Sequence, residues 1–236
     1  MIRYIDSKKM GRGRHNWLDS HFHFSFAEYQ NPDNIHFGQL RVINDDIIQP
    51  HTGFDPHPHS NMEIISYTVQ GQLTHGDSMG NNRTLTRGQV QYMSAGTGVV
   101  HSEYNNEDKP LRLLQIWIFP DKHGYEPNYG DYQFAIEDRI DKWLPMVTSY
   151  DNSSSFAPIK IHQDMNIFST IVSAGKQLEF EVATGRQAYL VLIEGSMEIN
   201  GQQFNMRDGA EIVEEKFVVN ATTDSHILLL EMEKLA

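Results

Sequence analysis

His57-Pro58-His59 and, further along the chain, His101-Ser102-Glu103 are the stretches of sequence that decide the fold. Each stretch places two side chains capable of binding a metal at positions i and i+2. Successive side chains of a β-strand point to opposite faces, so residues at i and i+2 share a face. A helix would instead need a spacing of three or four residues. Three imidazoles and one carboxylate on two strands therefore predict a site for one divalent transition metal on a β-scaffold.

Other stretches of the chain are also typical of strands. Residues 39–44, 63–70 and 111–119 are rich in β-branched or aromatic side chains and are bounded by polar or turn residues. Asn200-Gly201 lies between two short strand-like stretches and predicts a two-residue hairpin turn, because both residues tolerate a positive φ. Helical periodicity is scarce, with short helical pieces expected near residues 135–143. The sequence predicts an all-β protein.

An internal similarity indicates two related β-domains. Residues 67–74 (YTVQGQLT) are echoed by residues 191–198 (VLIEGSME), and residues 87–90 resemble residues 208–211. We place the domains at residues 1–125 and 126–236, with residues 151–155 as the most linker-like segment. The positions in the second half that correspond to the four metal-binding residues are Glu181, Ala183, Thr222 and Asp224. This set is not a ligand cluster, so we expect one metal site per chain, in the first domain.

Composition restricts the class of protein further. The chain has 236 residues, of which 39% are hydrophobic, and this is sufficient for a packed core. It has no Cys, which fits a reducing compartment, and its first residues lack the apolar stretch of a secretion signal. No apolar run approaches the roughly 20 residues of a membrane helix. The net charge of −12 argues against direct binding of nucleic acid. We expect a soluble, cytoplasmic protein.

The first half of the chain resembles a known family. Residues 53–63 (GFDPHPHSNME) and 93–105 (MSAGTGVVHSEYN) are similar to the two cupin motifs, in the form found in pirins and bacterial pirin-like quercetin 2,3-dioxygenases. Residues 17–26 and 40–46 resemble the same group, so the similarity covers essentially residues 1–120. The resemblance implies a bicupin, in which two β-barrel (jelly-roll or cupin) domains pack together and the N-terminal one alone binds a metal.

The resemblance also implies which side chains bind that metal. In pirins the ligands correspond to His57, His59, His101 and Glu103 of this sequence. Most cupins instead take their carboxylate from the first motif, where this chain has Glu63. Two carboxylates therefore compete for one role. We favour Glu103 as the ligand and expect Glu63 to lie near the metal, where it could accept a proton.

Two departures from the general cupin pattern are specific to the chain. Three residues rather than five separate Gly53 from His57, and Gly96 stands where a proline is common. Gly96 and Gly98 are expected to permit the tight turn that precedes His101, because glycine accepts backbone conformations that other residues do not.

Other polar residues are weaker candidates for metal ligands. His21 and His23 form another i, i+2 pair, but they have no carboxylate partner at strand spacing and alternate with phenylalanines, which is typical of a half-buried strand. His51 and His75 are expected in turns or at the surface, although His75 follows a strand that could line the barrel. Gln115 is expected either to face the cavity or to be a hydrogen-bonded polar residue of the barrel.

The resemblance implies a reaction. Quercetin 2,3-dioxygenases cleave flavonols with O2 and release carbon monoxide; Glu63 or Glu103 would take the proton of the flavonol hydroxyl. Phe54, Met62 and Met93 are expected among the cavity walls because they lie near the motifs. We expect Fe(II) as the metal, although the nitrogen-rich ligand set also suits Ni, Co, Mn or Zn.

Two alternatives remain open at the level of sequence. One is a metal-binding regulatory protein of the pirin type, which acts through protein partners and whose enzymatic activity is incidental. The other is a different cupin reaction, such as an isomerisation or another ring cleavage, because fold and metal do not fix the substrate.

Overall fold

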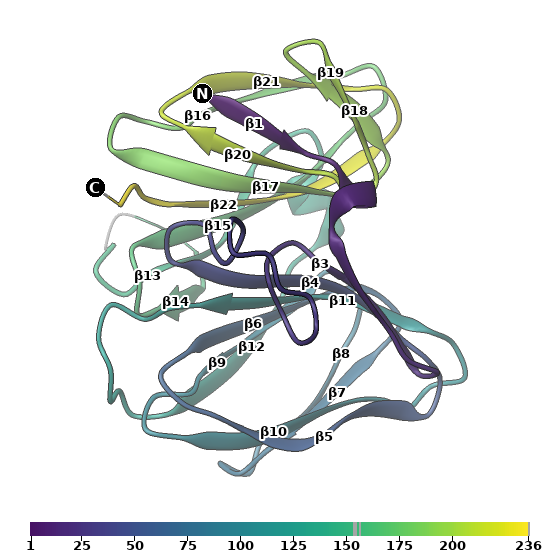
Figure 1. Ribbon diagram of the computed structural model, residues 1–236, viewed down its shortest axis with the longest axis vertical. Helices are drawn as coiled ribbons and strands as arrows, with labels where there is room; N and C mark the ends of the chain where they lie inside the picture. The colour runs from purple at the N-terminus through teal and green to yellow at the C-terminus, as the bar shows by residue number, and fades with distance from the viewer. Residues whose placement is uncertain (153–154, 156, 236) are drawn as a thin grey trace. The chain divides into compact units, whose positions relative to one another are not determined.

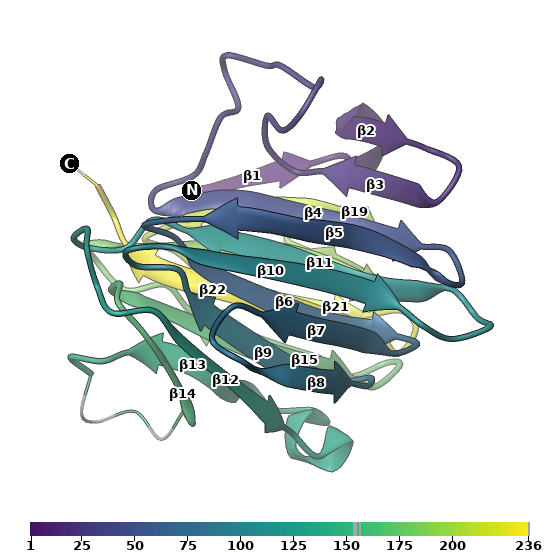
Figure 2. The ribbon, with the colours of Figure 1, turned by 90° about the horizontal axis from the view of Figure 1, so that it is seen from below.

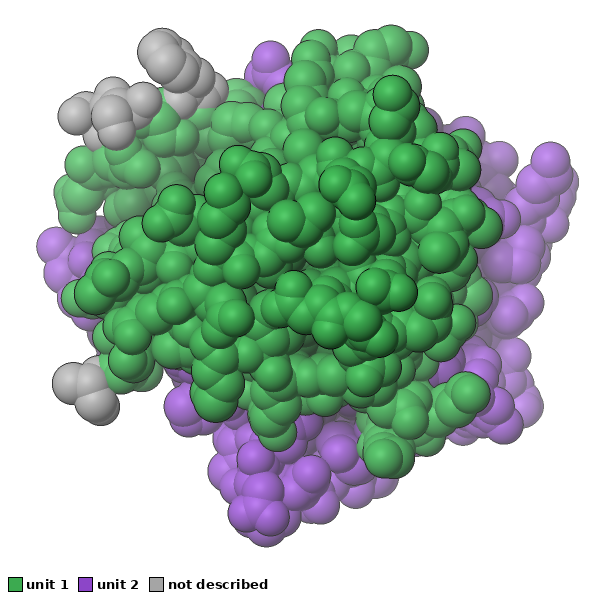
Figure 3. Space-filling view, turned by 90° about the horizontal axis from the view of Figure 1, so that it is seen from above, with its two compact units in different colours: residues 1–10, 135–160, 164–236 green, residues 11–134, 161–163 purple. Residues whose placement is uncertain are grey.

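The computed structural model describes residues 1–152, 155 and 157–235. The chain divides into two compact units, which Figure 3 shows in different colours. Unit 2 consists of residues 11–134 and 161–163, and unit 1 of residues 1–10, 135–160 and 164–236. Each unit is built around one seven-stranded and one four-stranded antiparallel sheet, an arrangement that fits the cupin jelly roll. The prediction of an all-β fold with two cupin domains is confirmed, although the sheets do not close into continuous barrels.

Unit 2 contains the predicted metal-binding residues. Its strands are β2 (Gly11–Arg14), β3 (Leu18–Phe22), β4 (Leu40–Ile48), β5 (Thr52–His59), β6 (Glu63–Gln70), β7 (Leu73–Asp77), β8 (Asn82–Leu85), β9 (Gln89–Ser94), β10 (Val99–Asn105), β11 (Leu111–Ile118) and β12 (Asn128–Gln133). The seven-stranded sheet has the order β12-β9-β6-β11-β4-β3-β2, and the four-stranded sheet has the order β5-β10-β7-β8. Figure 2 shows the four-stranded sheet lying across one face of the seven-stranded sheet.

Unit 1 repeats this layout. Its elements are β1 (Ile2–Ile5), the 3-10 turns η1 (Ser7–Lys9) and η2 (Ile136–Arg139), β13 (Leu144–Ser149), β14 (Ile159–Ile161), β15 (Met165–Val172), β16 (Gln177–Glu181), β17 (Arg186–Glu194), β18 (Ser196–Ile199), β19 (Gln202–Asn205), β20 (Gly209–Val213), β21 (Lys216–Ala221) and β22 (Ser225–Glu233). The seven-stranded order is β1-β20-β17-β22-β15-β13-β14, and the four-stranded order is β16-β21-β18-β19. Neither 3-10 turn is long or apolar enough to cross a membrane, and the described residues form no other helix.

The local predictions agree with these elements. The stretches predicted at residues 39–44, 63–70 and 111–119 correspond to β4, β6 and β11, which are adjacent in the seven-stranded sheet of unit 2. Asn200 and Gly201, with φ values of 50° and 78°, form the hairpin turn between β18 and β19, as predicted. The helical piece expected near residues 135–143 is the short turn η2.

The structure supports one of the two sequence matches that indicated an internal repeat and shows that the other was aligned incorrectly. Gly71 and Gly195 are equivalent: both have positive φ, and a Cβ on either would lie within 3.0 Å of a backbone oxygen. In the other match, the backbone amide of Gly88 donates to the carbonyl oxygen of Thr68 at 2.9 Å. The backbone amide of Arg207 donates in the same way to the carbonyl oxygen of Leu192 at 2.7 Å. Arg207 is therefore the counterpart of Gly88. The predicted match of residues 87–90 to 208–211 was shifted because Arg207 adopts the positive φ by itself, without a glycine that would mark the turn.

The compact units differ from the division at residues 125 and 126 in three places, which are residues 1–10, 126–134 and 161–163. Residues 1–10 belong to unit 1 because β1 pairs with β20 along its whole length. Residues 126–134 belong to unit 2 because β12 pairs with β9. The segment expected as a linker, residues 151–155, follows β13 inside unit 1, and its residues 153 and 154 lie outside the described part of the chain.

A buried ion pair joins two central strands of unit 2. Arg112 on β11 donates from Nε and one terminal nitrogen to the two carboxylate oxygens of Asp45 on β4, at 2.8 and 2.6 Å. The two side chains are 9% and 0% exposed. Two parallel hydrogen bonds fix the geometry of the pair as well as neutralise its charges.

We predict that Asp45→Asn strongly destabilises the protein. The substitution removes the carboxylate that pairs with the buried guanidinium of Arg112, and breaking a buried ion pair in this way typically costs about 3–5 kcal/mol. The measurement is the urea midpoint of unfolding. Asp19→Asn is the control, because Asp19 forms a more exposed pair with Arg12 and such pairs contribute about 1 kcal/mol or less. Similar shifts for the two variants would contradict the prediction.

Candidate metal centre

Pairing of β5 with β10 positions the three histidines. His57 lies opposite His101 and His59 opposite Val99, so all three imidazoles lie on one face of the four-stranded sheet. β5 is an edge strand, and this is where a strand with Pro56 and Pro58 is tolerated, because proline has no N–H to donate to a second neighbour. The register shifts between His101 and Glu103, which places Glu103 opposite Phe54. The prolines of the local sequence thus fit the edge position of β5.

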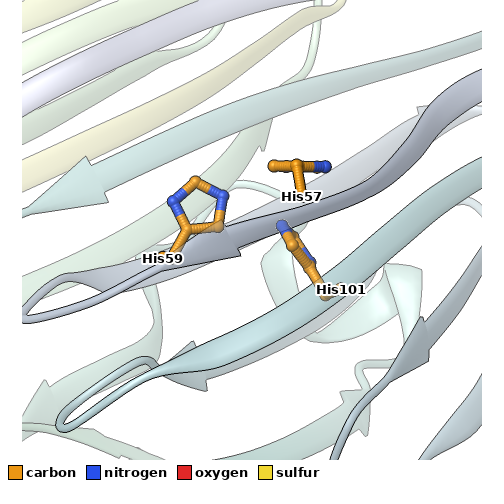
Figure 4. Close-up of side chains that lie close together, drawn as sticks. All are labelled: His57, His59 and His101. Atoms are coloured by element: carbon orange, nitrogen blue, oxygen red, sulfur yellow. The ribbon is translucent and has the colours of Figure 1, made fainter.

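The three imidazoles converge. Figure 4 shows the rings of His57 and His59 on one strand turned toward that of His101 on its neighbour. Their ring centroids are 4.5 Å (57 to 101) and 4.9 Å (57 to 59, and 59 to 101) apart. One nitrogen from each ring lies within 4.8 Å of the others. The structure therefore brings together the three histidines that the sequence pairs at i, i+2 spacing.

The hydrogen bonding of these rings fits a divalent metal. Nδ1 of His57 donates to the carbonyl oxygen of Asp55 at 2.7 Å, which leaves a lone pair on Nε2. Nε2 of His59 and both ring nitrogens of His101 are buried without a hydrogen-bond partner. Buried polar atoms without partners are rare and costly in folded proteins. A cation among the three lone pairs would account for Nε2 of His59 and for one of the two nitrogens of His101, because a neutral imidazole has a single lone pair.

The environment keeps the rings of His59 and His101 neutral, as metal binding requires. Burial, together with the neighbouring imidazoles of His101 and His57, lowers the pKa of His59 to about 4. Burial and the imidazoles of His57 and His75 lower the pKa of His101 to about 3. Protons therefore do not compete with a cation at neutral pH.

Glu103 lies next to this group but outside it. Its Oε1 accepts hydrogen bonds from Ser66 at 2.7 Å and from Gln91 at 3.0 Å, and its Oε2 accepts one from Gln115. These three donors come from adjacent strands of the seven-stranded sheet, β9, β6 and β11. Two sheets thus build the site: one carries Glu103 and the histidines, and the other orients the carboxylate. Gln115 faces the cavity, which was one of the two roles expected for it.

A cavity of about 290 Å³ opens onto the site. Its apolar side chains are mostly aromatic, with Trp17 and Phe54 in edge-to-face contact at 5.0 Å and Phe26 and Trp117 at 5.5 Å. The polar side chains in its lining are His15, Ser20, Glu28, Asn44, Asp46, His57, His59, Glu103 and Gln115. An aromatic cavity with a few converging polar groups is typical of a site for a small planar ligand.

The cavity walls correct one expectation and reveal residues that the sequence analysis missed. Phe54 lines the cavity as expected, but Met62 and Met93 do not; they pack with Ile64 and Val99 in a separate apolar cluster. The walls also include residues of β3 and β4, namely Leu18, Ser20, Phe22, Asn44 and Asp46. The alternation of residues 18, 20 and 22 was a signal of a shared face, but nothing in the sequence indicated that this face lines the cavity.

Glu63 is not brought to the histidines. Its carboxylate accepts hydrogen bonds from Ser94 at 2.6 Å and from the backbone amide of His162 at 3.3 Å. Glu63 and Ser66 are three positions apart on β6, and Ser66 faces Glu103, so the side chains of Glu63 and Ser66 point to opposite faces of the sheet. Burial raises the pKa of Glu63, and the bond from Ser94 partly offsets this. The expected position near the metal rested on comparing strand parity between β5 and β6, which belong to different sheets.

The other histidines are distributed as follows. His75 is completely buried, contrary to the expected turn or surface position; its Nε2 bonds to Asp77 at 2.9 Å, and its ring lies 5.5 Å from that of His101. His51 is exposed, as expected. His21 and His23 lie outside the group of converging imidazoles.

Gly96 explains a departure from the common cupin pattern. Its φ is +43°, whereas a proline ring fixes φ near −65°. A Cβ at this position would also lie 2.0 Å from the backbone oxygen of Tyr125. The turn before β10 therefore has a backbone path in this chain that excludes proline.

Comparison with known proteins relates both halves of the chain to one family. Residues 5–118 match the family model described as Pirin, and residues 146–232 match the model described as the quercetinase C-terminal cupin domain. The chain is 37% identical to the quercetin 2,3-dioxygenase of Escherichia coli strain K12 over 235 residues, which is 98% of this chain and 99% of that protein. It is 40% identical to the pirin-like protein of Caulobacter vibrioides over 231 residues, 96% and 99% of the two chains.

A solved structure is similar over the same length. The bacterial pirin YhhW of Escherichia coli, in complex with nickel(II), matches with a TM-score of 0.91 and 36% identity, and the match covers 100% of both chains. The fold and the site define a two-domain cupin with a candidate metal centre in one domain. The chain belongs to the pirin family.

We predict that the metal-free protein loses stability as the pH falls from 7 toward 4. Unfolded histidines have a pKa of about 6.5, above the folded values of about 4 for His59 and about 3 for His101. Between these values the unfolded chain binds more protons than the folded chain, so acid favours unfolding. The measurement is the melting temperature after chelation at pH 7, 6 and 5. His101→Gln should show a smaller decrease; equal decreases would contradict the assignment.

Proposed function

We propose that this protein is a metal-dependent dioxygenase of the pirin type, which cleaves flavonols such as quercetin with O2 and releases carbon monoxide. The observation that carries the proposal is the location of His57, His59 and Glu103 in the wall of one aromatic cavity, with His101 converging on the two histidines. The relatives named quercetin 2,3-dioxygenase, which match along nearly the whole chain, support the same activity.

In this proposal His57, His59, His101 and Glu103 hold one divalent ion. Glu103 would contribute Oε2, because each carboxylate oxygen has two lone pairs and Oε1 already accepts two hydrogen bonds. Fe(II) is our first expectation, and the nickel(II) complex of the Escherichia coli relative supports Ni(II) as an alternative. When bound, such an ion supplies the Lewis acidity that favours the deprotonated flavonol.

The residues of the chain have three tasks. The rings of Trp17, Phe54 and Trp117 bind the flat substrate and exclude water. Gln115 and Ser66 hold Glu103 in one orientation. Oε2 of Glu103 takes the proton of the flavonol 3-hydroxyl; its one remaining lone pair serves either the ion or the proton, but not both at once. Glu63 has no part in this step because it faces away from Ser66 and Glu103.

We predict that His59→Ala abolishes metal-dependent substrate binding. Loss of one of three converging imidazoles opens the site, so metal content measured by mass spectrometry should fall well below one ion per chain. Anaerobic titration with quercetin should shift the flavonol absorption band in the wild type but not in the variant. Equal shifts in both proteins would reject chelation of the flavonol at this site.

We predict that the two buried glutamates differ in their effect on turnover. Glu103→Gln should lower the rate of O2 uptake with quercetin by roughly 10²- to 10⁴-fold, the usual contribution of a positioned general base. Glu63→Gln is the matched control, since it makes the same change at a carboxylate of similar burial, and should alter the rate by less than about threefold.

Oxygen uptake also separates this proposal from the regulatory alternative. Steady uptake and release of carbon monoxide by the metal-loaded protein support the enzyme. Binding of flavonol and metal without turnover would contradict the proposed activity and favour a protein that acts through partners.

A further inference from the structure

A row of polar side chains crosses the sheet beneath the cavity. Strand register places Asn44 opposite Gln115, Gln115 opposite Ser66, and Ser66 opposite Gln91. Gln115, Ser66 and Gln91 donate to Glu103. Asn44 ends the row, and its Oδ1 is buried without any hydrogen-bond partner although the residue lines the cavity. Three side chains of the row therefore have Glu103 as a hydrogen-bond partner, whereas Oδ1 of Asn44 has no partner among the described residues.

A second acid lies beside Asn44. Asp46 follows at i+2 on β4, so both side chains share the cavity face. Ser20, opposite Asp46 on β3, donates to its Oδ1. Asp46 is only 2% exposed, and its Oδ2 has no hydrogen bond among the described residues. Asn44 and Asp46 thus present two unused polar atoms, both separate from the three histidines, to a space that is otherwise mainly aromatic.

We expect a ligand atom or a water molecule next to Oδ1 of Asn44. Leaving a buried acceptor unsatisfied costs on the order of 1–3 kcal/mol, so such atoms usually meet a ligand or an ordered water. Trp17, Phe22, Phe26 and Phe54 in the same lining favour a flat aromatic ligand over a sugar or an ion. A phenolic hydroxyl satisfies both requirements, because it belongs to an aromatic ring and both donates and accepts a hydrogen bond.

We propose that Asn44 and Asp46 form a recognition point for a second hydroxyl of the substrate, so that the enzyme selects polyhydroxylated flavonols over those that carry the 3-hydroxyl alone. The hydroxyl donates to Oδ1 of Asn44 and accepts from the carboxyl group of Asp46, which Ser20 orients. This selectivity rests on the proposed function, since it concerns the same cavity. It adds a specificity site away from the residues that hold the metal.

The electrostatics of Asp46 are consistent with donation. Burial raises its pKa to about 7; the bond from Ser20 opposes this rise, and the negative charges of Asp45 and Glu103 add to it. A substantial fraction of the side chain is therefore protonated at neutral pH and can donate a proton to the oxygen of a phenol.

The test compares two ligands that differ in hydroxylation, quercetin and 3-hydroxyflavone. Their dissociation constants are measured anaerobically by calorimetry with the metal-loaded full-length protein. The wild type should bind quercetin more tightly. In Asn44→Leu this preference should fall by about three- to tenfold, the value of one hydrogen bond, while affinity for 3-hydroxyflavone and metal content are unchanged.

Thr68→Val is the matched control. The hydroxyl of Thr68 is also buried without a partner on a strand of the same sheet, but Thr68 does not line the cavity. Its substitution should leave the preference for quercetin unchanged. A preference equal to that of the wild type in Asn44→Leu, or an equal loss in both variants, would overturn the inference.

A crystal structure of the wild-type quercetin complex provides a measurement that does not depend on the folding of a variant. A substrate hydroxyl within hydrogen-bond distance of Oδ1 of Asn44 supports the inference, and an ordered water alone at that atom overturns it. Failure of quercetin to bind the wild type also overturns it. Selective binding without O2 uptake would instead contradict the proposed function and leave the recognition point intact.

Discussion

The antiparallel pairing of β5 with β10 is the constraint on which the candidate site depends. It places His57 directly opposite His101, and His59, two residue pairs further along, opposite Val99. Because side chains alternate along a strand, a shift of one residue in this pairing would turn His101 to the outer face. The prolines of β5 confine it to the edge of its sheet, so β10 is its single partner there. A local feature of the sequence thereby limits β5 to one partner, and the register with that partner sets the geometry of the site.

The seven-stranded sheet of unit 2 supplies the hydrogen bonds that orient Glu103. Ser66, Gln91 and Gln115 come from three neighbouring strands and all donate to the carboxylate of Glu103, which belongs to the opposite sheet. These bonds hold Glu103 apart from the imidazoles with a single lone pair free. In the proposed function, metal binding and substrate selection belong to different sheets: the four-stranded sheet carries the histidines, and β4 of the seven-stranded sheet carries Asn44 and Asp46.

The comparison of Glu63 with Glu103 shows where reasoning from sequence reaches its limit. Both are buried glutamates that follow histidines in a motif, and each was a candidate for ligand or base. Strand parity relates side chains within one strand, or between strands whose pairing is known. His101 and Glu103 share β10, so their common face could be predicted; His59 and Glu63 belong to different sheets, so it could not. His75 illustrates the same limit, because its burial depends on Asp77 and Tyr129.

The sequence by itself determined the all-β class, the central strands β4, β6 and β11, the hairpin at Asn200-Gly201 and the pairing of histidines at i, i+2, since each follows from local periodicity or backbone preference. Tertiary structure alone decided that β3 and β4 line the cavity, that Glu63 turns away from it, and that β1 joins the strands of unit 1. The physical reason is that these outcomes depend on which strands pair across long stretches of chain, and alternation along one strand carries no information about its partner.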